Sequence, residues 1–142
     1  MRFHAQLTLT GKHLDILYVT EQMHIQPDFF REHCQSGDGM RAWGIENELE
    51  GVFSVEDVIW TLIERIQKSA DQMPKLAEML HSSWCFHITF ELTKSRNAMD
   101  PMCAGRKDES FPPIFVGTPT ISVLQRLNAA LQIDGIIHIQ HE

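Results

Sequence analysis

The sequence Phe53-Ser-Val-Glu-Asp-Val-Ile-Trp-Thr-Leu-Ile-Glu-Arg-Ile-Gln-Lys68 predicts the main helix of this protein. Its apolar residues recur at the i, i+3, i+4, i+7 spacing of an amphipathic helix: Val55, Val58, Ile59, Leu62, Ile63 and Ile66. Ser54 is a good N-cap, because its hydroxyl can accept a hydrogen bond from an unpaired backbone N–H group. Glu56 and Asp57 place negative charge at the positive end of the helix dipole.

This helix needs an apolar surface to lie on. Six buried aliphatic side chains contribute on the order of 9–18 kcal/mol, whereas ordering about 15 residues costs roughly 22 kcal/mol. Strands that alternate in polarity are predicted to supply that surface. The clearest strand carries Trp84, Phe86, Ile88, Phe90 and Leu92 on one side. An N-terminal strand, closed by Gly11, likewise carries Phe3, Ala5, Leu7 and Leu9.

The remaining elements are read from caps, prolines and periodicity. The sequence predicts a helix over 16–23 capped by Asp15, a strand over 43–49, a helical stretch led by Pro74, a short edge strand over 114–116, a helix capped by Thr118 that runs to about Leu131, a turn at Asp134-Gly135, and a final strand over 136–140. The stretch 28–39 is polar and is predicted to hold no element.

This order of elements favours a single α+β domain over residues 1–142. Strands with one apolar side belong in a two-layer sandwich, since a doubly wound sheet has strands that are apolar on both faces. We expect a sheet of four or five mostly antiparallel strands with helices on one face, a ferredoxin-like variant. Residues 94–113 are expected to form a long mobile loop, because a loop of about 20 residues exceeds what compact domains commonly contain.

Composition narrows the class of protein. A net charge of −7 argues against nucleic-acid binding, which requires a basic face. Five acids and no bases lie between Glu46 and Asp57, a local charge that would attract a basic partner. No apolar run approaches the length of a membrane span. Three cysteines without a C-x-x-C pair favour a reducing, cytoplasmic location.

Several short segments together resemble a bacterial uncharacterised family, the domain of unknown function numbered forty-two seventy-nine. They are Leu14-Asp15, Thr20, Pro27, Trp43-Gly-Ile45, the 53–68 helix, Pro119 with Leu124 and Leu127, and Asp134. The family's tract after the proline is approximated by Gln35-Ser36-Gly37-Asp38. The resemblance implies no activity. It implies a small bacterial cytosolic protein encoded near toxin or defence genes.

No catalytic motif is present, so the sequence leans towards a non-enzymatic protein and leaves open an active site assembled from distant residues. No cofactor is predicted. Weak candidates for a metal site lie on the polar sides of three predicted strands: His4, Cys85, His87, Glu91 and His138. If those strands were neighbours, the five side chains would share one face, although zinc would need three or four of them within about 2.0–2.3 Å of one point.

Trp60 lies off the centre of the apolar stripe, beside Glu64 and Gln67. An indole at that position either lines the rim of the core or anchors another chain. The sequence therefore favours a protein-interaction module that binds a protein partner or associates with itself as a homodimer. One version is an immunity-type protein that neutralises a toxin. The alternative is a small-molecule or metal-binding domain that uses the polar face of the sheet.

Overall fold

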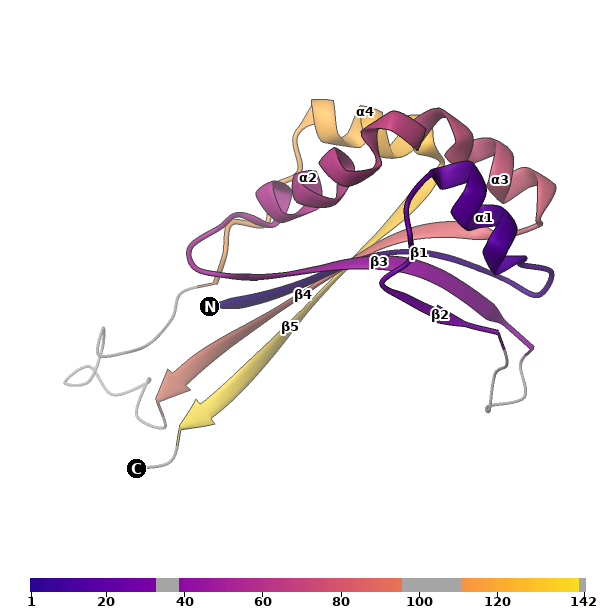
Figure 1. Ribbon diagram of the computed structural model, residues 1–142. Helices are drawn as coiled ribbons and strands as arrows, with labels where there is room; N and C mark the ends of the chain where they lie inside the picture. Colours follow the sequence, from indigo (N-terminus) through magenta and orange to yellow (C-terminus); the bar gives the residue numbers. More distant parts are fainter. Residues whose placement is uncertain (33–38, 96–110, 141–142) are drawn as a thin grey trace.

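The computed structural model describes residues 1–32, 39–95 and 111–140, which form one sheet with helices on one face (Figure 1). The strands are β1 (Arg2–Gly11), β2 (Phe29–Arg31), β3 (Arg41–Glu50), β4 (Ser83–Ser95) and β5 (Ala129–Gln140). The helices are α1 (Ile16–Met23), α2 (Val55–Ile66), the 3₁₀ helix η1 (Gln67–Gln72), α3 (Met73–Met79) and α4 (Thr118–Leu127). Within the described ranges, no helix is long and apolar enough to cross a membrane.

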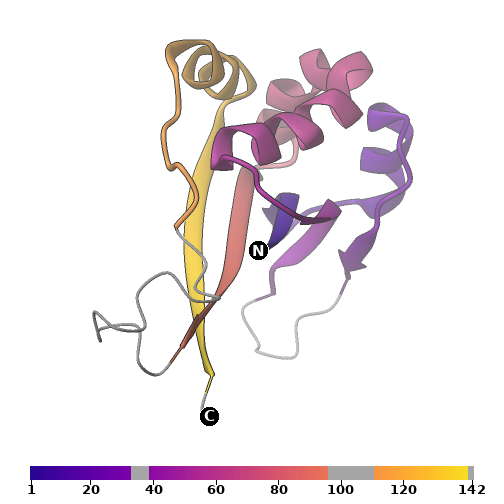
Figure 2. The ribbon, with the colours of Figure 1, turned by 90° about the vertical axis from the view of Figure 1, so that its left-hand side faces the viewer.

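The strand order is β2-β3-β1-β4-β5. All pairs are antiparallel except β4 and β5, which are parallel and are connected through α4. Figure 2 shows α4 above the β5 side of the sheet and α1 above the β2–β3 side. The predicted α+β two-layer sandwich with a mostly antiparallel sheet is therefore confirmed.

The predicted main helix is confirmed as α2. Ser54 and Asp57 form a reciprocal capping box: the Asp57 N–H donates to Ser54 Oγ over 3.1 Å, and the Ser54 N–H donates to Asp57 Oδ2 over 3.2 Å. All six apolar residues of the predicted stripe are buried. They pack on the inner sides of the strands, where Trp43 and Trp84 meet edge to face with ring centroids 5.9 Å apart.

The strand β2 was not predicted. Phe29 lies opposite Gly44 in the antiparallel β2–β3 pair, and a Cβ atom at Gly44 would lie 2.1 Å from Cζ of the Phe29 ring. The glycine that weakens the sequence pattern of β3 is therefore the residue that makes room for an aromatic ring from the neighbouring strand.

Three predictions for the C-terminal third of the chain are wrong. The helix predicted to reach Leu131 ends at Leu127, where Asn128 adopts a left-handed conformation with φ of 53°. Its cap is Gly117, one residue before the predicted Thr118. β5 begins at Ala129, so Asp134 and Gly135 lie inside a strand and form no turn. Parallel pairing of all twelve residues with β4 overrides the local turn signal.

The short edge strand predicted over 114–116 is absent. Two prolines precede it and cannot donate backbone hydrogen bonds, and the segment instead meets the start of α2 through the Val55 N–H, which donates to the Pro113 carbonyl over 3.1 Å. The predicted loop begins later than residue 94, since β4 continues to Ser95. Its residues 96–110, the tract Gln35–Asp38 and the cysteines Cys34 and Cys103 fall outside the described residues.

Candidate functional site

The polar side of the sheet is the candidate functional site. The helices cover the opposite side, so every second strand residue faces away from the core. The open face consists of these outward residues: Phe29 and Arg31 on β2; Ala42, Gly44, Glu46, Glu48 and Glu50 on β3; Arg2, His4, Gln6, Thr8 and Thr10 on β1; Ser83, Cys85, His87, Thr89, Glu91 and Thr93 on β4; and Ala130, Gln132, Asp134, Ile136 and His138 on β5.

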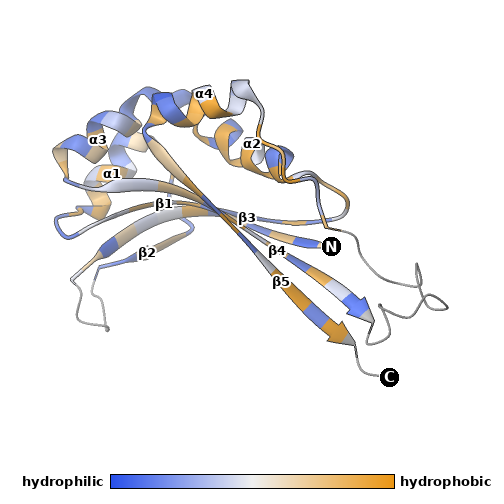
Figure 3. Cartoon of the chain, turned by 180° about the vertical axis from the view of Figure 1, so that it is seen from behind, coloured by the Kyte–Doolittle hydropathy of each residue, from blue (hydrophilic) through white to orange (hydrophobic). Residues whose placement is uncertain are grey.

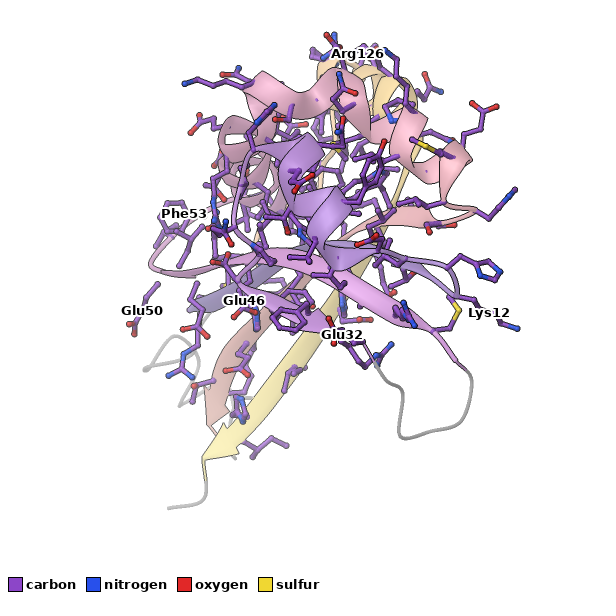
Figure 4. All side chains as sticks on the ribbon, turned by 45° about the vertical axis from the view of Figure 1, so that its right-hand side comes forward. Lys12, Glu32, Glu46, Glu50, Phe53 and Arg126 are labelled. Carbon is purple, nitrogen blue, oxygen red and sulfur yellow. The ribbon has the colours of Figure 1, made fainter. Side chains whose placement is uncertain are left out.

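The open face is acidic. Five carboxylates lie on it with two arginines, Arg2 and Arg31. Three of the carboxylates are Glu46, Glu48 and Glu50, which alternate along β3, and Figure 4 shows Glu46 and Glu50 on the side of β3 that faces away from the helices. The acidic run noticed in the sequence therefore divides in two, because Glu56 and Asp57 belong to the start of α2 on the other side of the sheet.

The first histidine–carboxylate pair joins β1 to β3. His4 Nε2 lies 2.9 Å from Glu46 Oε2, and the Gln6 amide donates to the same oxygen over 3.4 Å. The side chains of His4 and Glu46 are 39% and 37% exposed. Both groups therefore remain accessible to a partner while they hold each other in position.

The second pair joins β4 to β5. His87 Nε2 lies 2.6 Å from Asp134 Oδ2, and the Gln132 amide donates to the same oxygen over 3.0 Å. These hydrogen bonds hold the pKa of Asp134 below its usual range, and the bond from His87 has the larger effect. Asp134 is therefore a carboxylate at neutral pH, and it orients the His87 ring.

The third group lies where β1 begins, beside the last residue of β3 and near the ends of β4 and β5. Glu91 Oε2 is 3.7 Å from both Arg2 Nη1 and His138 Nε2. These three residues line an open hollow of about 410 Å³ together with Met1, Glu50 and Thr93. A hollow with two carboxylates on its wall is suited to the tip of a basic side chain.

The five weak metal candidates share the open face, because β1, β4 and β5 are neighbours. Register nevertheless spreads them along it. Cys85 lies near the start of β4, whereas His138 pairs with Thr93 near the end of that strand. Within the described residues, no group of three or more His, Cys, Asp or Glu side chains could hold a metal ion. The candidates His4, His87 and His138 contact the carboxylates of Glu46, Asp134 and Glu91 instead. Glu46 and Asp134 were not among the metal candidates.

Cys85 lies two residues from His87 on the same strand face, where a thiol and a possible base are near each other. Burial raises the pKa of the Cys85 thiol, and its Sγ is directed to the Phe86 carbonyl at 3.5 Å. The thiol is therefore protonated at neutral pH and is a poor nucleophile.

Trp60 is half-buried and lies on the helical layer, away from the open face. Its indole N–H donates to Thr120 Oγ1 over 2.8 Å, and the Thr120 hydroxyl donates to Glu56 Oε2 over 3.0 Å. Glu56 also accepts the backbone N–H of Gly117, so that these contacts join the start of α2 to the start of α4. Trp60 as an anchor for another chain stays a prediction, and the structure adds this internal role.

The sequence contains signals for part of the site. The alternation of His4, Gln6 and Thr8, and of Cys85, His87 and Thr89, correctly places these residues on one polar side. The partners Glu46 and Asp134 were missed because β5 was predicted to begin after Asp134, and because nothing in the sequence sets the pairing of β3 with β1. Only a predicted register would have found them.

Comparison with protein families identifies the chain. The family model described as a domain of unknown function (DUF4279) matches residues 1–137, so the chain belongs to that family. No curated protein and no solved structure gives a significant match.

Proposed function

We propose that this member of the DUF4279 family is a non-enzymatic protein-interaction module whose open face binds a basic protein surface. The observation that carries the proposal is the charge of that face, where five carboxylates lie with two arginines. None of the helices in the described part of the chain covers them. Complementary charge steers association and selects partners.

The chemistry of the face supports binding better than catalysis. His4 and His87 each contact a carboxylate through Nε2, and the Cys85 thiol is protonated at neutral pH. A nucleophile poised beside a base, which acyl-transfer enzymes require, is thus not assembled among these residues.

The hollow beside Arg2 is the proposed binding position for a basic side chain of the partner. Glu50 and Glu91 stand on its wall, and a lysine or arginine tip inserted there would gain charge-assisted hydrogen bonds. An immunity-type protein that covers the basic surface of a toxin is a specific form of this proposal. Binding of a small cationic molecule in the same hollow is the second candidate, favoured by the same carboxylates.

The experiment measures binding of a decalysine peptide by calorimetry at low and at physiological ionic strength. The variant E46Q/E48Q/E50Q removes three carboxylates from the open face, and E64Q/D71N/E78Q removes three exposed carboxylates from the helical layer. Both change the net charge equally. We expect the first to weaken binding by about tenfold and the second to leave it nearly unchanged.

Equal weakening by the two triple variants would mean that total charge, and no particular face, attracts the peptide. Binding of spermidine distinguishes the protein-interaction module from the small-molecule site. A small-molecule site in the hollow would bind spermidine saturably, and the single variant E50Q would abolish that binding. An interaction module binds spermidine far more weakly than decalysine.

A further inference from the structure

The two edges of the sheet differ in whether side chains occupy their outward backbone hydrogen-bonding groups. At the β3 edge, beyond the short β2, side chains occupy the outward backbone groups of Glu46. Its N–H donates to Asp28 Oδ2 over 2.8 Å, and its carbonyl accepts from Arg65 Nη1 over 3.0 Å. Arg65 also contacts Asp28 directly at 2.9 Å. At Glu46 this edge is therefore closed to another strand.

Among the described residues, no side chain is bound to the outer side of β5 in this way. β5 is the last strand of the sheet and is twelve residues long, and in the described part of the chain no strand pairs with its outer side. It contains no lysine, arginine or proline, the residues with which proteins protect exposed edges. Near its end Ile136, Ile137 and Ile139 are 42%, 49% and 58% exposed. Figure 3 shows this apolar end of β5.

We propose that β5 pairs with β5 of a second copy of this chain, antiparallel and centred on Ile136, so that the two five-stranded sheets become one continuous sheet. In this register the strand is complementary to itself. Asp134 lies opposite His138 of the second copy, and His138 lies opposite Asp134, so the contact occurs twice about the two-fold axis. Ile133 lies opposite Ile139, and Ile137 lies opposite Gly135, where it would meet the Phe90 ring that lies against that glycine.

Other registers lack this match. Directly opposite residues share a face, so for the two open faces to be continuous the symmetric registers must be centred on a single residue. Centring on Asp134 places two carboxylates together, and centring on Gly135 or Ile137 places Asp134 or His138 opposite Ile136. Centring on His138 would place Asp134 opposite a position that lies beyond the end of β5 at Gln140. Only the Ile136 register joins each acid to an imidazole.

The arrangement of the described helices and strands permits this contact. The C-terminal ends of β4 and β5 project beyond the helical layer, as Figure 1 shows at its lower left. A second copy can therefore approach Gln132–Gln140 without meeting α4, which lies over the other end of β5. The Asp134 carboxylate accepts bonds from His87 and Gln132 at one oxygen and has lone pairs left for a further donor.

The first test is a cross-link in the full chain. Ile136 faces itself across the axis, so the variant Ile136→Cys should form a disulfide-linked dimer under mild oxidation, and mass spectrometry should find the two substituted positions joined to each other. Ile139→Cys is the matched control, because it is more exposed yet lies six residues from its counterpart in this register, beyond disulfide reach. Equal cross-linking of both variants, or of neither, would overturn the proposal.

The second test is sedimentation equilibrium. We expect a wild-type dimer whose dissociation constant rises about tenfold in His138→Asp, which sets like charges opposite each other, and recovers in the swapped variant D134H/H138D. Circular dichroism checks that each variant is folded. A wild-type chain that stays monomeric would contradict the pairing, and so would a dimer whose dissociation constant is unchanged in His138→Asp. The test is independent of decalysine binding, so it can fail while the proposed function stands.

Discussion

The ring of Phe90 on β4 lies against the backbone of Gly135 on β5, so closely that a Cβ atom at residue 135 would be 2.6 Å from ring atom Cζ. The two residues are direct partners in the parallel pair. Gly135 therefore serves the close approach of a ring inside a strand, where its local sequence indicates a turn. The same ring meets Phe111 edge to face at 6.1 Å, which covers this part of the core.

The variant Gly135→Ala should be destabilised by about 1–3 kcal/mol, because the new methyl group must displace the Phe90 ring. Urea unfolding measures the change. In a Phe90→Ala background the same substitution should cost little, since the ring is gone. Equal costs in the two backgrounds would show that the glycine is required for another reason.

The contact between α2 and α4 depends on Thr120, which is only 1% exposed. Thr120→Val keeps the shape of the side chain but removes both the acceptor for the Trp60 N–H and the donor to Glu56. We expect a loss of about 1–3 kcal/mol in thermal or urea unfolding. Thr118→Val, at an exposed position of the same helix, is the control and should change stability little.

Trp60 itself allows its two roles to be separated. Trp60→Phe keeps an aromatic ring and removes the indole N–H, so it should lower stability by about 0.5–1.5 kcal/mol. The anchor prediction requires that Trp60→Ala weaken self-association or partner binding more than folding. A large fall in melting temperature together with unchanged sedimentation would contradict that requirement.

Asp28 should contribute to the acid sensitivity of folding. The hydrogen bond from Arg65, aided by the Glu46 N–H, holds the pKa of Asp28 below the ordinary 3.8, against an opposing effect of burial. The stabilisation is present above the unfolded pKa and is lost as pH falls through the lower folded pKa. Because the pair is about one third exposed, the effect is below about 1 kcal/mol.

The variant Asp28→Asn measures this contribution by urea unfolding at neutral pH and at about pH 3. It should be less stable than the wild type at neutral pH, and the difference should shrink in acid. A difference that stays the same at both pH values would show that Arg65 gains nothing from the charge of Asp28.

The pairing of His87 with Asp134 predicts a specific titration. The pKa of Asp134 lies below 3.8 chiefly because His87 hydrogen-bonds the carboxylate. In His87→Phe the pKa of Asp134 should rise towards 3.8, although Gln132 still contacts it. Carbon-13 NMR of the labelled carboxyl group follows the change, and an unaltered titration in the variant would show that the imidazole has no effect on it.

Local patterns predicted most of the elements. The Ser54 cap and apolar stripe define α2, Asp15 caps α1 through the Tyr18 N–H at 3.1 Å, and alternation defines β1 and β4. Each of these signals is contained within a few turns of helix or a few residues of strand, so it survives without knowledge of the rest of the chain. The open face was predictable to the same extent, as a polar side of the sheet.

Tertiary structure decided the remainder. Phe29–Arg31 is a strand because it pairs with β3, Ala129–Ile133 is a strand because it pairs with β4, and the partners of His4 and His87 follow from register. Register depends on contacts between residues far apart in the chain, and a slip of one residue would turn every outward side chain into the core. The residue types by themselves therefore determined which side chains are polar and alternate, and only the paired strands determined which of them meet.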